Sequence, residues 1–231
     1  MQINRVRPYS VVPPVVQALL VVNGILFLLE LYIGDQLINK LALWPVGLSA
    51  TPLFAVARPQ FEPWQLVTYS FLHGSVTHLL LNMYALWLFG SRMENVWGSK
   101  AFALYYFVCV IGAGLVQLFV ATQTTGEGGI FPTIGASGGV FGLLLAFGLT
   151  FPNERLVLIF PPVVLRAKWF VLIYGTIELW AASPALKRAW PISRIWAACC
   201  LVSCCCFTGV AIPPGTARSD SKGEIIGIGL D

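Results

Sequence analysis

The sequence predicts an all-α fold, a polytopic bundle of membrane-spanning helices. Hydrophobic residues make up 57% of the 231 residues and charged residues only 10%, whereas soluble domains carry about 25% charged residues. Several apolar runs approach the roughly 20 residues that a helix needs to cross the hydrocarbon core. The net charge of +4 is small and is spread over the connections. It therefore indicates orientation in the membrane, and we expect no nucleic-acid partner.

Five spans are expected along the chain, separated by short connections. They cover residues 14–33, 76–92, 101–121, 137–151 and 169–182. The long connection over residues 35–64 mixes a few charges with aromatic residues and prolines, and we expect it to lie on or partly in the membrane surface. A last apolar stretch, residues 195–212, is long enough to cross as a sixth span. The distribution of Lys and Arg over the short connections predicts a cytoplasmic N-terminus.

Two segments carry the polar residues that could perform chemistry within these spans. Ser137 lies in the run GASGGVFG at the start of the fourth span. His78 and Asn82 are four residues apart at the start of the second, so they share one helix face. Both can donate hydrogen bonds, and paired donors that face a nucleophile form an oxyanion site. Alternatively, small residues four apart and polar side chains between helices serve only to pack the bundle.

Cysteine and histidine are placed in ways that predict neither a metal nor a cofactor. Cys109 stands alone, and the other cysteines crowd into residues 199–206 without a metal-ligand spacing. The only histidines are His73 and His78. We expect His73, at the mouth of the second span, to cap the helix or to contact the preceding loop.

The motifs taken together resemble those of the rhomboid intramembrane serine proteases. The run FLHGS, then His78 and Asn82, then GASG occur in the order and spacing of that family, and the resemblance covers roughly residues 15–180. It implies six helices and a Ser–His dyad in a water-filled cavity that opens to the non-cytoplasmic side. It also implies that Ser137 is the nucleophile, and that His78 and Asn82 are oxyanion donors together with the backbone N–H of Ser137.

The same resemblance implies transmembrane protein substrates and a bilayer environment, and we expect a bacterial inner (plasma) membrane location. The general base of the family lies on its last helix, in an Ala-His-x-x-Gly pattern. This chain has no histidine after His78. We therefore divide it into a rhomboid-like transmembrane domain, residues 1–180, and an aberrant C-terminal segment, residues 181–231, in which residues 195–212 are followed by a polar tail.

A shifted reading frame would explain why the histidine that acts as general base in the family is missing from this chain. When each codon starts at the third base of one residue and ends with the second base of the next, the junction 190/191 must encode alanine, 196/197 glycine and 199/200 leucine. The junction 194/195 can then encode histidine, within the pattern of the family's last helix. The alternative is a genuinely divergent tail, and the sequence leaves both open.

Two functions follow from this reading. The first is a rhomboid-type serine endopeptidase that is inactive as written, because its base is absent. The second is a non-catalytic membrane protein that binds transmembrane helices of other proteins. A transporter is disfavoured because no ionisable residue sits at the centre of a span and no inverted repeat is evident.

Overall fold

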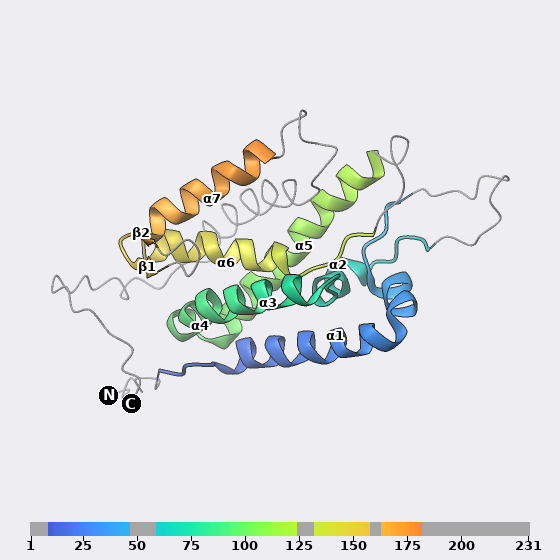
Figure 1. Cartoon of the computed structure of the whole chain (residues 1–231), viewed down its shortest axis with the longest axis horizontal. Coiled ribbons are helices and arrows are strands. Elements are labelled where there is room, and N and C mark those ends of the chain that lie inside the picture. The colour runs from blue at the N-terminus through green and yellow to red at the C-terminus, as the bar shows by residue number, and fades with distance from the viewer. Residues whose placement is uncertain (1–8, 47–58, 124–131, 158–162, 182–231) are drawn as a thin grey trace, which may run out of the picture.

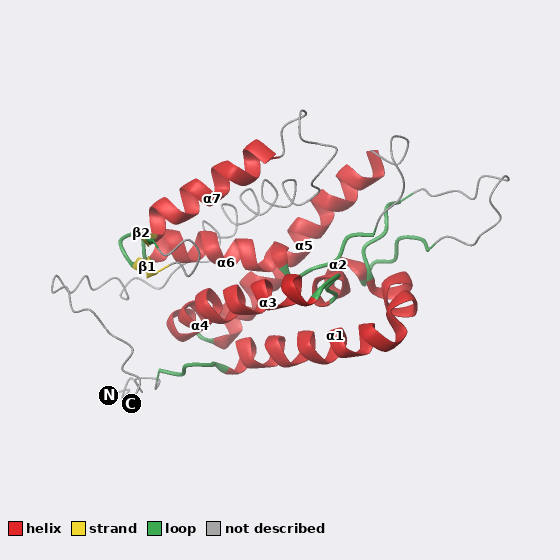
Figure 2. Cartoon of the chain, in the orientation of Figure 1, coloured by secondary structure: helices red, strands yellow, loops and turns green. Residues whose placement is uncertain are grey.

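The computed structural model describes residues 9–46, 59–123, 132–157 and 163–181, which form a helical bundle with one short hairpin (Figures 1 and 2). The elements in chain order are α1 (Pro14–Leu41), α2 (Gln65–Thr68), η1 (Tyr69–Phe71), α3 (Val76–Ala85), η2 (Leu86–Gly90), α4 (Ser91–Trp97), α5 (Ser99–Gln123), α6 (Ser137–Thr150), β1 (Arg155–Val157), β2 (Val164–Arg166) and α7 (Ala167–Ala181). In Figure 1, α1 and α7 lie on opposite sides, with the other helices between them.

The first helix is held at its start by a residue from a different part of the chain. Pro14 occupies the first helical position, where its missing N–H costs nothing. The carboxylate of the buried Glu94 on α4 accepts hydrogen bonds from the backbone N–H groups of Val15 and Val16, at 3.0 and 2.9 Å. The helix bends at Ile33, where the backbone leaves helical geometry. The helical geometry is thus interrupted at the residue where we expected the first span to end, and a further helical stretch continues to Leu41.

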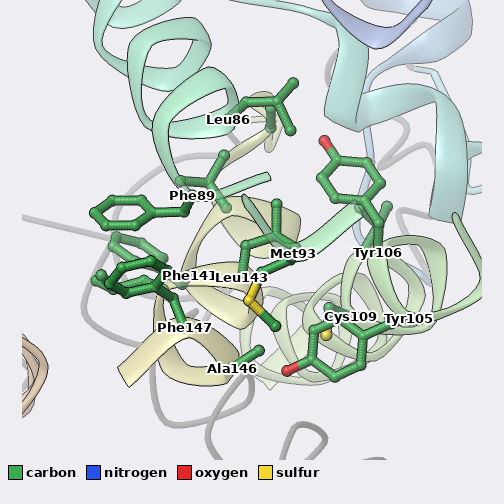
Figure 3. Packing of buried hydrophobic residues seen from close by; sticks show 14 of the residues in the cluster. Leu86, Phe89, Met93, Tyr105, Tyr106, Cys109, Phe141, Leu143, Ala146 and Phe147 are labelled. Atoms are coloured by element: carbon green, nitrogen blue, oxygen red, sulfur yellow. The ribbon is translucent and has the colours of Figure 1, made fainter. Parts of the chain in front are cut away.

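The core lies where η2 and α4 meet α5 and α6 (Figure 3). On α6, Gly139 lies so close to α5 that a Cβ atom on this residue would overlap the ring of Tyr106. One turn further along α6, the carbonyl of Gly142 accepts a hydrogen bond of 2.9 Å from the hydroxyl of Tyr105. The glycines of α6 therefore allow its backbone to contact the tyrosine rings of α5 directly. Such close approach at small residues is common in membrane bundles.

The expected helices are present, but five membrane spans are not confirmed. By length and apolar composition, α1 and α5 could each cross a membrane. The apolar α6 has only 14 residues, fewer than the roughly 20 of a full crossing. Residues 76–97 run through α3, a π-helical turn at η2, and α4. The sixth stretch, residues 195–212, lies outside the described residues.

A two-stranded hairpin replaces the plain connection that we expected between α6 and α7. Strands β1 and β2 pair antiparallel, with Arg155 opposite Arg166 and Val157 opposite Val164. The fold is therefore not purely helical. Strands of three residues carry too little alternation of polar and apolar residues to be identified from sequence.

Candidate functional site

The loop before α6 is fixed by backbone bonds to two other segments. Thr133 and Leu43 exchange N–H···O bonds of 3.0 Å, and the N–H of Gly135 donates to the carbonyl of Tyr69 at 2.9 Å. Gly135 has a φ of 125°, a conformation that only glycine adopts readily. This turn places Ser137 at the first position of α6, where backbone N–H groups have no partner within the helix.

The second segment of the site is the start of α3. Ser75 caps this helix by accepting a hydrogen bond of 3.1 Å from the backbone N–H of His78. Asn82 lies one turn further on and is buried. Its amide nitrogen donates to the carbonyl of His78 at 2.9 Å, so one of its two amide N–H groups is engaged within α3.

His78 and Ser137 meet around Gly135. A methyl group at Gly135 would lie 2.8 Å from Cε1 and 2.9 Å from Nε2 of His78, and 3.8 Å from Oγ of Ser137. Nε2 of His78 and Oγ of Ser137 thus both lie within 4 Å of the same point, the position of a Cβ at Gly135. No hydrogen bond joins Asn82 to Ser137 among the described residues, although α3 and α6, which carry them, contact each other.

His73 lies in the loop between η1 and α3, and its ring contacts that of His78. The two ring centroids are 5.1 Å apart in an edge-to-face arrangement. The side chain is buried, and neither of its ring nitrogens makes a well-formed hydrogen bond in the described part of the chain. Burial, followed by the proximity of His78, lowers the pKa of His73 to about 4, and the backbone of Phe71 opposes this only weakly. His73 is therefore uncharged at neutral pH.

Glu30 of α1 anchors this loop and was not singled out as a site residue from the sequence. Its Oε2 accepts a hydrogen bond of 3.0 Å from the backbone N–H of His73. The sequence signal for such a residue is an acidic side chain within an apolar run. Likewise, the sequence indicated no role for Gly135 of its own beyond the GASG run and the alternative of helix packing, whereas this glycine sets the turn that presents Ser137 and leaves room for the ring of His78.

This arrangement can support nucleophilic chemistry at a carbonyl. A hydroxyl at a helix N-terminus lies beside backbone N–H groups and the positive end of the helix dipole, both of which stabilise a developing oxyanion. An imidazole next to it can donate a further hydrogen bond. The described residues contain no group of three or more His, Cys, Asp or Glu side chains that could hold a metal ion.

Comparison with known proteins gives one family match. A family model described as "Rhomboid domain" matches residues 60–197. Mouse "Presenilin-associated rhomboid-like protein, mitochondrial" is 38% identical over 105 residues, which are 44% of this chain and 26% of that protein. Arabidopsis thaliana "RHOMBOID-like protein 4" is 38% identical over 84 residues, 36% of this chain and 19% of the relative. Bacillus subtilis "Rhomboid protease GluP" is 36% identical over 118 residues, 51% of this chain and 20% of the relative. The matched part of the chain thus spans about a quarter or less of the length of these relatives.

Proposed function

Because the chain belongs to the rhomboid family, we propose that it carries the nucleophilic half of an intramembrane serine-protease site and lacks the general base. Ser137 is the nucleophile of this proposal. The backbone N–H of Ser137, His78 and Asn82 are the donors to the oxyanion. Its substrates would be transmembrane segments of other membrane proteins, cut near the non-cytoplasmic face.

The mechanism needs a proton acceptor that the sequence does not supply. In a serine protease, a base removes the hydroxyl proton as the oxygen attacks the scissile carbonyl, and the donors hold the resulting oxyanion. The histidines of this chain are His73 and His78 alone. His78 is assigned to the oxyanion, and the ring nitrogens of His73 form no hydrogen bond to Ser137 in the described part of the chain, so we assign neither as the base. Loss of one member of such a unit lowers kcat by about 10⁴-fold or more.

The observation that carries the proposal is the closeness of Ser137 Oγ and His78 Nε2 around Gly135. Two segments 59 positions apart in the sequence contribute these atoms, and a glycine with positive φ makes room for both. Simple helix packing requires a small residue at Gly135, but it does not require a hydroxyl and an imidazole on either side of it.

A cleavage assay tests the proposal. The purified chain, incubated in detergent with a transmembrane reporter, is expected to give no cleavage above that of Ser137→Ala. Cleavage that Ser137→Ala abolishes and Ser91→Ala leaves unchanged would refute the claim that the base is missing. Ser91 is a suitable control because it is also buried but lies on α4 within the hydrophobic core.

The second candidate function is a non-catalytic protein that binds transmembrane helices, and the absence of a histidine after His78 favours it. A fluorophosphonate probe separates the two. Slow labelling that disappears in Ser137→Ala indicates a nucleophile with residual activation, which supports the incomplete protease. Absence of labelling in the folded protein, together with co-purification of a transmembrane helix, supports the binder.

The location proposed here is a membrane with the N-terminus in the cytoplasm or its equivalent compartment. The relatives include mitochondrial proteins of animals as well as a bacterial one. They therefore give no support to the expected bacterial inner membrane in particular.

A further inference from the structure

The hairpin between α6 and α7 presents one exposed face that combines basic and apolar residues. Along each strand, side chains alternate between the two faces. The outer residues of β1, Arg155 and Val157, are exposed, whereas Leu156 between them is buried. On β2, Val164 and Arg166 are likewise exposed. Because each arginine lies opposite the other, and each valine opposite the other, one face carries two arginines beside two valines.

The two arginines are placed unfavourably for a protein in water. Like charges directly opposite each other in an antiparallel pair destabilise it. Neither arginine forms an ion pair with an acidic residue in the described part of the chain. The neighbouring Glu154 pairs instead with Arg92, at 3.8 Å. An anion between Arg155 and Arg166 would remove the repulsion, since guanidinium groups bind phosphate oxygens in a bidentate manner.

Two valines and a tryptophan beside the arginines are exposed and could contact the apolar part of a lipid whose phosphate is the anion. The exposed fraction is 69% for Val157 and 56% for Val164. Trp169, in the first turn of α7, is 51% exposed, and the ammonium group of Lys168 lies 5.7 Å from the centre of its ring. Tryptophan and lysine are typical of the interface between hydrocarbon and headgroups. Isolated exposed apolar residues need no explanation, but here they border the basic residues on one short hairpin.

The hairpin also lies at the basic end of the bundle. Figure 1 shows it at the same end of the bundle as α4 and the start of α1. Most basic residues of the described part are found there, namely Arg92, Lys100, Arg155, Arg166 and Lys168. Positive charge on one side of a membrane protein marks the side that faces the anionic cytoplasmic leaflet.

We propose that this hairpin face, made of Arg155, Arg166, Val157 and Val164, is a docking site for anionic phospholipid headgroups. The lipid phosphate lies between the two arginines, and the valines contact the upper acyl region. The site begins 18 residues after Ser137, beyond the C-terminal end of α6, and the proposal is independent of whether the chain cleaves peptides.

Thermal unfolding of the full chain in a neutral detergent, with added phosphatidylglycerol or phosphatidylcholine, tests this. Phosphatidylglycerol is expected to raise Tm and phosphatidylcholine to have a much smaller effect. In Arg155→Gln/Arg166→Gln, the half-saturating concentration of phosphatidylglycerol should rise about tenfold or more. Without lipid, this variant should unfold at the same or a higher temperature than the original chain, because the repulsion is gone.

Two controls separate the site from general charge effects. Lys100→Gln removes an exposed basic residue at the same end but outside the hairpin, and it should keep the response to phosphatidylglycerol. Arg155→Lys/Arg166→Lys keeps the charge and should retain most of the response. The proposal is overturned if the glutamine variant responds like the original chain, or if it unfolds at a lower temperature without lipid. It is also overturned if glycerol phosphate or an acidic peptide stabilises the chain as much as the lipid does.

Discussion

At the scale of single residues, Gly135 contributes most to the candidate site. It combines a φ of 125° with contact to the ring of His78. The sequence allowed us to single out Ser137, His78 and Asn82, because polar side chains in apolar runs are conspicuous. It did not reveal the role of Gly135, since a glycine in a glycine-rich run gives no indication of its φ. Nor did it reveal that Glu30 bonds the backbone of His73, because that contact depends on how α1 lies against the loop.

Gly135→Ala should therefore destabilise the protein. The new Cβ would lie 2.8 Å from Cε1 of His78, in a backbone conformation that costs a side-chain-bearing residue about 1–3 kcal/mol. Thermal unfolding in detergent measures this. Gly24→Ala in α1 is the matched control, because its Cβ would meet nothing within 4 Å. It should be neutral or stabilising by up to about 1 kcal/mol. Equal effects of both substitutions would contradict the assigned role of Gly135.

His73 predicts a dependence of stability on pH. Its pKa in the folded protein is lowered to about 4 from an ordinary value of 6.5. Between these values the unfolded chain binds a proton that the folded chain does not, so stability falls as the pH decreases from 6.5 towards 4. His73→Phe keeps a ring in the buried position and removes the titration. As the pH is lowered from 6.5 to 4, the Tm of this variant should decrease less than that of the original chain. Identical dependences of Tm on pH in the two chains would argue against a buried neutral imidazole.

At the scale of elements, the positions of most helices could be predicted from apolar runs, whereas their ends could not. The third expected span, residues 101–121, lies within α5, and the fourth coincides with α6 to within one residue. The extension of α1 beyond Ile33 was missed because the helix bends there and continues with a more polar sequence. The hairpin was missed because its pairing is decided by contacts between segments and not by local periodicity.

The join between α1 and α4 is a further contact between elements that can be tested. The buried Glu94 accepts bonds from Val15 and Val16 and from the hydroxyl of Ser99, the last at 2.6 Å. Glu94→Gln removes the charge from these bonds and should lower the free energy of unfolding by about 1–3 kcal/mol. Glu154→Gln, which breaks only an exposed ion pair, should change it by less than about 1 kcal/mol. Denaturant titration in mixed micelles compares the two, and the reverse order would contradict the capping role.

At the scale of the whole molecule, the family could be identified from motif order alone, and the match to residues 60–197 confirms it. The membership follows from short segments that lie far apart in the sequence and converge in the fold. Activity cannot be read in the same way, because it depends on a base that the family places on its last helix, beyond the described residues.

A chain with its C-terminal part replaced tests the shifted-frame explanation. Residues after about Trp180 would be exchanged for those that the shifted frame encodes, which include a histidine at the junction 194/195. Such a chain should cleave a transmembrane reporter at least about 10⁴-fold faster than the original, since a complete unit would be restored. The same chain with that histidine changed to alanine is the control. Failure of a folded, restored chain to cleave would favour genuine divergence of the tail.

The tight contact of Gly139 with Tyr106 has a consequence for how the molecule can move. The ring of Tyr106 packs directly against the backbone of Gly139, and the neighbouring Tyr105 donates a hydrogen bond to the carbonyl of Gly142. Because of these contacts, α6 cannot slide along α5 without steric overlap. These two helices therefore behave as one rigid unit that keeps the hydroxyl of Ser137 at a constant position relative to α5. A transmembrane helix of the kind proposed above as substrate or ligand would therefore have to enter by displacing elements on the other sides of α6. On its addition, spin labels should report distance changes there while the α5–α6 distance stays constant.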